Sequence, residues 1–224
     1  MIKTIKKITN KHLVAERVNR FWLVYYSVGL AGFILPFTRD LFMSLTGLTI
    51  IMSTILMLWF HTPWNNRFIF ASSTVFAGGI LIEALGVNSG MIFGTYYYGD
   101  ILGPKIMKTP ILIGLNWLML IYIVWQLVNS VQTDTFTKLI MGSTIMVGYD
   151  IFLEPVAMAT NMWNWSLNTV PIQNYLAWFV VSFIFLWVFK MSNTNYNNPV
   201  ASRLLAAQIV FFMLLNVVNQ ISGL

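Results

Sequence analysis

The segment Asp150-Ile151-Phe152-Leu153-Glu154-Pro155 lies at the end of a long apolar run, near residues 136–157, that has the length and composition of a membrane-spanning helix. Residues four apart on a helix share one face, so the carboxyl groups of Asp150 and Glu154 are expected about one turn apart. Acids inside a membrane are costly, and they are usually paired, protonated or functional. No basic residue lies nearby to neutralise this pair, so the sequence predicts a buried acidic site.

The composition around this segment is that of an integral membrane protein. Of the 224 residues, 58% are hydrophobic and 9% are charged, whereas soluble domains carry roughly a quarter charged residues. Short loops separate the apolar runs, which predicts one all-α domain over residues 21–224, a polytopic transmembrane helical bundle of about seven spans. The spans are expected near residues 21–37, 41–60, 68–86, 110–128, 136–157, 172–189 and 203–221.

The distribution of lysine and arginine predicts the orientation of the bundle. Residues 1–20 carry six basic side chains and lead into an apolar run without a small-residue cleavage site, so they are interpreted as a retained basic cytoplasmic leader. If the N-terminus is cytoplasmic, ten Lys and Arg residues lie inside and three outside. This predicts a multi-pass protein of the cell membrane with its C-terminus outside. Because the basic residues flank apolar runs, they do not indicate a nucleic-acid partner.

Several classes of site are excluded by composition. The chain has no cysteine, which excludes disulfides, thiolate catalysis and iron–sulfur clusters. The two histidines, His12 and His61, lie outside the predicted membrane core, which excludes a histidine-rich metal centre. Aspartate-rich motifs for magnesium and a diphosphate are absent. No metal and no cofactor is therefore expected.

Polar side chains from four predicted spans fall at one membrane depth, in the outer half of the bundle. They are Glu83, Asn116, the Asp150 and Glu154 pair, and Asn174. The Gly/Tyr-rich segment 87–109 falls at the same end, and it is too apolar for a solvated loop and too rich in glycine for a span. An interfacial or re-entrant segment between the third and fourth spans is therefore expected.

This set of residues is suited to acid–base chemistry without histidine. Burial favours the neutral form of a carboxyl group, and a second carboxyl nearby lets one hold a proton while the other ionises. Aromatic faces at the same depth could stabilise a developing cation. Purely structural roles, as hydrogen bonds between helices and an aromatic belt, are the alternative. The aromatic candidates are Phe93, Tyr96, Trp117, Trp163, Trp165 and Trp178.

Two motifs in this region resemble a known family. The first is Glu83-x-x-Gly86-x-x-x-Gly90-x-x-Phe93-Gly94-x-Tyr96-x-Tyr98, and the second is Asp150-x-x-Leu153-Glu154-Pro155 followed by Trp163-x-Trp165. Together they resemble the CruF-type carotenoid hydratases, which include bisanhydrobacterioruberin hydratase. The family often has Asp where this chain has Glu154, so the resemblance leaves open whether Asp150 or Glu154 is the proton donor.

The resemblance implies an enzyme that adds water across the terminal C1=C2 double bond of an acyclic carotenoid, a lipophilic substrate taken from the bilayer. Glu83, Asp150 and Glu154 would be catalytic, with Glu83 and either Asn116 or Asn174 holding the water. The substrate-binding candidates are Phe93, Tyr96, Asn116, Trp117, Trp163, Trp165, Asn174 and Trp178. A lycopene-cyclase-like isomerase and a non-catalytic carotenoid-binding protein remain as alternatives, and the sequence does not predict an oligomeric state.

Overall fold

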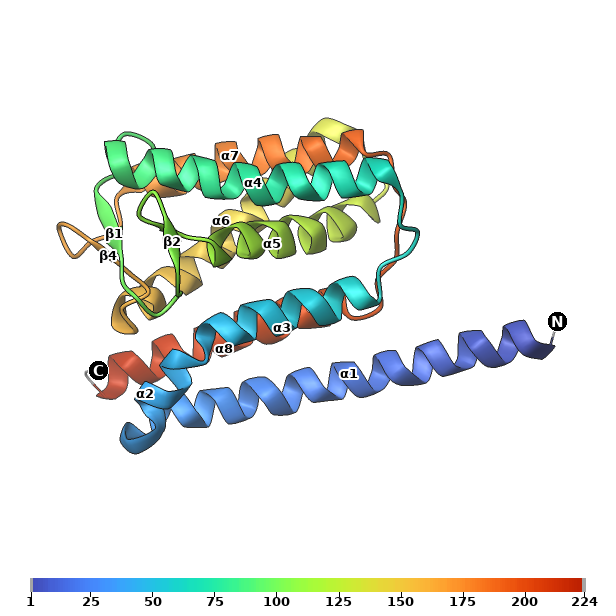
Figure 1. Cartoon of the computed structure of the whole chain (residues 1–224), viewed down its shortest axis with the longest axis horizontal. Helices are drawn as coiled ribbons and strands as arrows, with labels where there is room; N and C mark the ends of the chain where they lie inside the picture. Colours follow the sequence, from blue (N-terminus) through green and yellow to red (C-terminus); the bar gives the residue numbers. More distant parts are fainter. Residues whose placement is uncertain (1, 223–224) are drawn as a thin grey trace.

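The computed structural model describes residues 2–222, and the side chains of residues 13–221. Helices dominate this part of the chain and run roughly along one axis (Figure 1). They are α1 (Ile2–Ile34), α2 (Pro36–Ser44), α3 (Thr46–Trp59), α4 (Asn66–Ser89), α5 (Leu112–Asn129), α6 (Thr135–Ala159), α7 (Ile172–Met191) and α8 (Ala201–Ser222).

The fifth helix forms the centre of the bundle. Every residue from Trp117 to Trp125 is buried, because α3, α4, α6, α7 and α8 all pack against α5. Around it, α6 packs on α7 and α4 on α5, while α1 packs on α8 (Figure 1). A helix that is apolar on all sides is one that belongs in the interior.

The outward faces of the surrounding helices are also apolar. Phe70 and Leu81 on α4 and Leu176 and Trp187 on α7 are all at least half exposed. Contiguous exposed apolar surface of this kind is typical of contact with a membrane. Among the described residues, the five helices α4 to α8 are long and apolar enough to cross a membrane, and the bent pair α2–α3 would add a sixth. The predicted all-α membrane helical bundle is confirmed.

The predicted span at residues 41–60 corresponds to two helices that meet at an angle. The chain breaks at Leu45, and α2 and α3 meet at an angle of 53°. Pro36 begins α2 at a position that proline favours, and the hydroxyl of Thr38 donates to the carbonyl of Gly32 at 2.9 Å. Arg39 donates to the carbonyl of Ala159 at the C-terminal end of α6. These contacts hold α2 across the ends of α1 and α6, which a straight helix could not reach.

The predicted boundary between a leader and a first span has no counterpart in the backbone. Helix α1 is continuous from Ile2 to Ile34, and it is not among the helices that are apolar enough over a full span. Its apolar half packs against α8, where the rings of Tyr26 and Phe211 lie 5.5 Å apart between centroids. The side chains of residues 1–12 lie outside the described part.

The Gly/Tyr-rich segment contains short strands at one end of the bundle. Strand β1 (Tyr96–Tyr98) pairs in antiparallel fashion with β4 (Trp163–Trp165), which follows the end of α6. Within the segment, a short hairpin pairs β2 (Lys105–Ile106) with β3 (Thr109–Pro110). The β1–β4 pair, residues 96–98 and 163–165, is called the aromatic lid below. It lies at the end of the bundle where α8 ends (Figure 1).

Candidate functional site

Alternation along two short strands directs the aromatic residues of the lid inward. Tyr96 and Tyr98 are buried, whereas Tyr97 between them is 58% exposed. Trp163 and Trp165 on β4 are buried in the same way. In the register of the pair, Tyr96 lies opposite Trp165 and Tyr98 opposite Trp163. Successive side chains of a strand point to opposite faces, so all four rings share the inner face of the lid.

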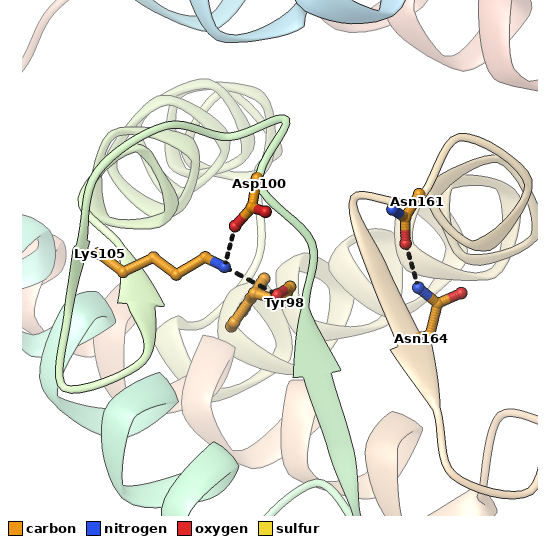
Figure 2. Close-up of polar contacts among 5 residues, drawn as sticks. All are labelled: Tyr98, Asp100, Lys105, Asn161 and Asn164. Carbon is orange, nitrogen blue, oxygen red and sulfur yellow. Dashed lines mark hydrogen bonds and ion pairs between the residues drawn. The ribbon is translucent and has the colours of Figure 1, made fainter.

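The outer face of the lid is held by polar contacts (Figure 2). The ammonium of Lys105 donates to the carbonyl of Tyr98 at 2.9 Å and to the carboxylate of Asp100 at 2.8 Å. This hydrogen bond and the positive charge of Lys105 lower the pKa of Asp100. Next to them, a Cβ atom on Gly99 would overlap the carbonyl of Asn161. Glycine is therefore needed directly after β1, where the chain passes close to the backbone that leads into β4.

Glu83 on α4 is held by three neutral donors. Tyr96 and Tyr98 donate their hydroxyls to Oε2 at 2.6 and 2.8 Å. The indole of Trp117 on α5 donates to Oε1 at 3.1 Å. Gly79 lies one turn before Glu83, and a Cβ atom there would come within 3.0 Å of Trp117. The missing side chain at Gly79 gives the indole room to reach the carboxylate.

Glu154 on α6 is also held by three neutral donors. The indole nitrogens of Trp163 and Trp165 donate to Oε2 at 2.9 and 2.8 Å. The amide of Asn174 on α7 donates to Oε1 at 3.2 Å. The inner face of the lid therefore divides its four donors equally between two carboxylates on different helices.

Asp150 is held differently from the two glutamates. The same Asn174 nitrogen donates to its Oδ2 at 2.7 Å, so one amide bridges Asp150 and Glu154. The other oxygen, Oδ1, is buried and has no hydrogen-bond partner among the described residues. An ionised carboxylate only accepts hydrogen bonds, whereas a protonated one also donates. A proton on Asp150 thus fits this arrangement, since Glu83 and Glu154 are already surrounded by donors.

A small polar cavity lies between the lid and the helices. Its volume is about 20 Å³, which is enough for about one water molecule. One wall is the stacked pair of Trp117 and Trp178, whose ring centroids are 4.4 Å apart. The lining residues are Glu83, Phe93, Tyr96, Tyr98, Ile113, Asn116, Trp117, Glu154, Trp163, Trp165, Asn174 and Trp178.

The two candidate asparagines differ in what they contact. Asn174 is buried, and its amide group is committed to Asp150 and Glu154. Asn116 lines the cavity without any hydrogen bond to another described residue. Of the two, Asn116 has the side chain that is free to hold a water molecule or a substrate.

The residues predicted as a site do lie together. All but Asp150 line the cavity, and Asp150 adjoins it through Asn174. Sequence reasoning did not include Tyr98 and Ile113 in the site. The spacing of Tyr96 and Tyr98 could have indicated a strand with both residues on one face. Within the described residues, no group of three histidine, cysteine, aspartate or glutamate side chains is arranged to hold a metal ion.

Comparison with known proteins supports the resemblance seen in the motifs. A protein-family model described as "carotenoid biosynthesis protein" matches residues 45–224, which is most of the chain. The chain belongs to the carotenoid biosynthesis protein family. The matched range contains every residue of the site and begins where α2 ends. No curated protein and no solved structure gives a significant match to the chain.

The lid of this carotenoid biosynthesis protein allows a test of its hydrogen bonds. Replacing Tyr98 by Phe removes one donor to Glu83 and is expected to lower the free energy of unfolding by about 1–3 kcal/mol, because hydrogen bonds to charged groups are among the stronger ones. Tyr97→Phe is the matched control, since its hydroxyl lies on the exposed face of the same strand. Thermal unfolding in detergent measures both, and equal melting temperatures would contradict the assignment.

Proposed function

We propose that this carotenoid biosynthesis protein adds water to the terminal C1=C2 double bond of an acyclic carotenoid. One observation carries the proposal. Asn174 lines a cavity the size of a water molecule and donates to Asp150, which keeps one buried oxygen without a partner, while Glu83 and Glu154 are each held by three donors. Membership of the family supplies the class of substrate.

In the first step, Asp150 acts as the general acid. Its proton is transferred to C2, where a new C–H bond forms from the electrons of the double bond. Positive charge develops on C1, which is the more substituted carbon and so carries a cation more readily. The stacked rings of Trp117 and Trp178 and the indoles of the lid surround the cavity, and their π faces stabilise the cation.

In the second step, water is added at C1. The free amide of Asn116 and the carboxylate of Glu83 hold one water molecule in the polar cavity. Its oxygen forms the bond to C1, and Glu83 accepts the proton that is released, which is general base catalysis. The proton returns to Asp150 before the next cycle, so the net reaction adds one water and uses no oxidant or reductant.

Glu154 is proposed as the group that positions the others. Its carboxyl group lies beside that of Asp150, and the amide of Asn174 donates to both. Its bonds to Trp163 and Trp165 hold β4 over the cavity. Replacing it would therefore alter both the proton donor and the lid.

The pigments of cells that make lycopene test the proposal. Expression of this chain is expected to yield products heavier than lycopene by the mass of one water molecule per reacted end. An unchanged mass with absorption at shorter wavelength would indicate cyclisation instead. The pigments could also stay unchanged with several acyclic substrates, in cells where the protein is present in the membrane. That result would contradict hydration and would favour a carotenoid-binding role.

We also propose that the protein is a multi-pass protein of the cell membrane, with the N-terminus in the cytoplasm and the C-terminus outside. Helix α1 begins and α8 ends at opposite ends of the bundle (Figure 1). By sequence, Arg67, Lys138 and Arg203 lie in the first turns of α4, α6 and α8, and Lys190 lies in the last turn of α7. These helix ends lie at the end of the bundle away from the lid (Figure 1). The expected result for a reporter enzyme fused to Leu224 is activity outside the cytoplasm, and cytoplasmic activity would overturn this orientation.

A further inference from the structure

A second cavity, much larger than the polar one, lies on the other side of the lid residue Trp163. Its volume is about 160 Å³, against about 20 Å³ for the polar cavity. Helices α1, α3, α5, α6 and α8 contribute to its walls, together with Phe42 of α2. Its lining is mainly aromatic and aliphatic, with Tyr25, Phe33, Phe211 and Phe212 among the largest side chains.

Four hydroxyls in or next to these walls form two pairs, whereas Thr46 Oγ1 and Gln208 Oε1 are buried without a hydrogen-bond partner among the described residues. The hydroxyls of Tyr25 and Thr49 are hydrogen-bonded at 2.7 Å, and Tyr26 and Ser53 lie 3.5 Å apart between their oxygens. Because these hydroxyls have partners, the tyrosines present their apolar rings to the space. Apolar walls of this kind suit a hydrocarbon and offer little to a charged or strongly polar ligand.

The two cavities meet at one shared wall. Ile113, Asn116 and Trp163 line both of them. Trp163 also donates its indole hydrogen to Glu154. A molecule in the large cavity can therefore place one end against the polar cavity only at this point.

The large cavity also reaches the outer surface of α1. Val28 lines it and is 54% exposed on a helix face that would contact lipid. Gly29, the next residue, lines it as well, and a Cβ atom there would make only an ordinary contact with Phe211. A larger side chain at Gly29 would extend into the space.

We propose that the large cavity binds the polyene chain of the acyclic carotenoid and that Val28 and Gly29 line its opening to the bilayer. This inference rests on the proposed function for the identity of the ligand. The polyene lies between α1 and α8. The end of the carotenoid that reacts contacts Asn116 and Trp163 at the shared wall. The occupant is an extended hydrocarbon because most of the side chains that line the cavity are aromatic or aliphatic.

Binding of lycopene to the purified full-length protein in lipid nanodiscs tests the inference. Lycopene is achiral, so circular dichroism in its visible band arises only when a protein holds it. Val28→Trp, which obstructs the opening, and Gly29→Leu, which fills the interior, are each expected to weaken binding by about tenfold or more. Val24→Trp is the matched control, because Val24 lies one turn earlier on α1, is also exposed and lines neither cavity.

The outcomes separate this inference from the proposed reaction. Loss of binding in Val28→Trp and Gly29→Leu, but not in Val24→Trp, supports the cavity whether or not lycopene is hydrated. Wild-type affinity in both cavity variants, with melting temperatures that show both to be folded, would overturn it. Absence of an induced signal with the wild-type protein would also overturn it. Binding without hydration would refute the reaction alone.

Discussion

Replacing Asp150 by Asn is expected to lower the rate of carotenoid hydration by about 10²–10⁴-fold, the range of a lost general acid. Asparagine has nearly the same shape, and its carbonyl oxygen can still accept from Asn174. It cannot supply a proton to C2, so the chemical step is lost while the fold is kept. The measurement is the yield of hydrated pigment per amount of membrane protein.

Asp134→Asn is the matched control for this substitution. Asp134 lies on the exposed N-cap of the same helix, where its side chain accepts from the backbone N–H of Thr137 at 3.0 Å. Asparagine is as good an N-cap as aspartate, so hydration should be unchanged. Wild-type yield in Asp150→Asn would remove this residue from the role of proton donor.

Replacing Glu83 by Gln is expected to lower hydration by a similar factor of about 10²–10⁴, because the amide cannot accept the proton from water. The free energy of unfolding of Glu83→Gln should also be lower than that of the wild type. The amide nitrogen is a donor, so it cannot accept from Tyr96, Tyr98 or Trp117 as the carboxylate does. Both quantities can be followed, the first by pigment analysis and the second by thermal unfolding.

Two further variants separate these effects of Glu83→Gln. Tyr98→Phe removes one hydrogen bond to Glu83 and keeps the carboxylate, so it should reduce stability with a far smaller loss of rate. Glu16→Gln changes the same residue type at an exposed position of α1 and should alter neither quantity. If Tyr98→Phe were as inactive as Glu83→Gln, the effect of Glu83 would lie in holding the lid closed, and its role as base would be refuted.

The convergence of the site residues was predictable because helix geometry and chain direction fix the depth of each side chain. Glu83, Asn116, Asp150 and Asn174 lie on four different helices and still meet, as the alternation of spans requires. Residue type also limited the chemistry, since the chain has no cysteine and few histidines. The roles given to these residues remain predictions.

Other features depended on contacts between distant segments. Strands of three residues carry little periodicity, so the pairing of Tyr96 with Trp165 could not be read from either segment alone. The break at Leu45 results from packing of α2 across α1 and α6. The large apolar cavity depends on how five helices leave space between their side chains. None of these is a property of local sequence.

The difference between Asp150 and Glu154 also depends on three-dimensional contacts. On sequence, both were acids on one helix face and either could have been the proton donor. The structure places two indoles and an amide on Glu154, and leaves one oxygen of Asp150 without a partner. The two acids are equivalent by their spacing on the helix, but their side chains point to different partners.

The hydrogen bonds of the lid have a consequence for how molecules travel through the protein. Lifting the lid would break four bonds to Glu83 and Glu154 and leave each carboxylate with one donor, from Trp117 and from Asn174, at a cost of roughly 6–12 kcal/mol. That is comparable to the whole stability of a typical domain. In the proposed reaction, the lid therefore stays closed throughout a cycle. On the proposed route of entry from the lipid, the product leaves through the same opening, so its new hydroxyl group passes into the bilayer rather than into water.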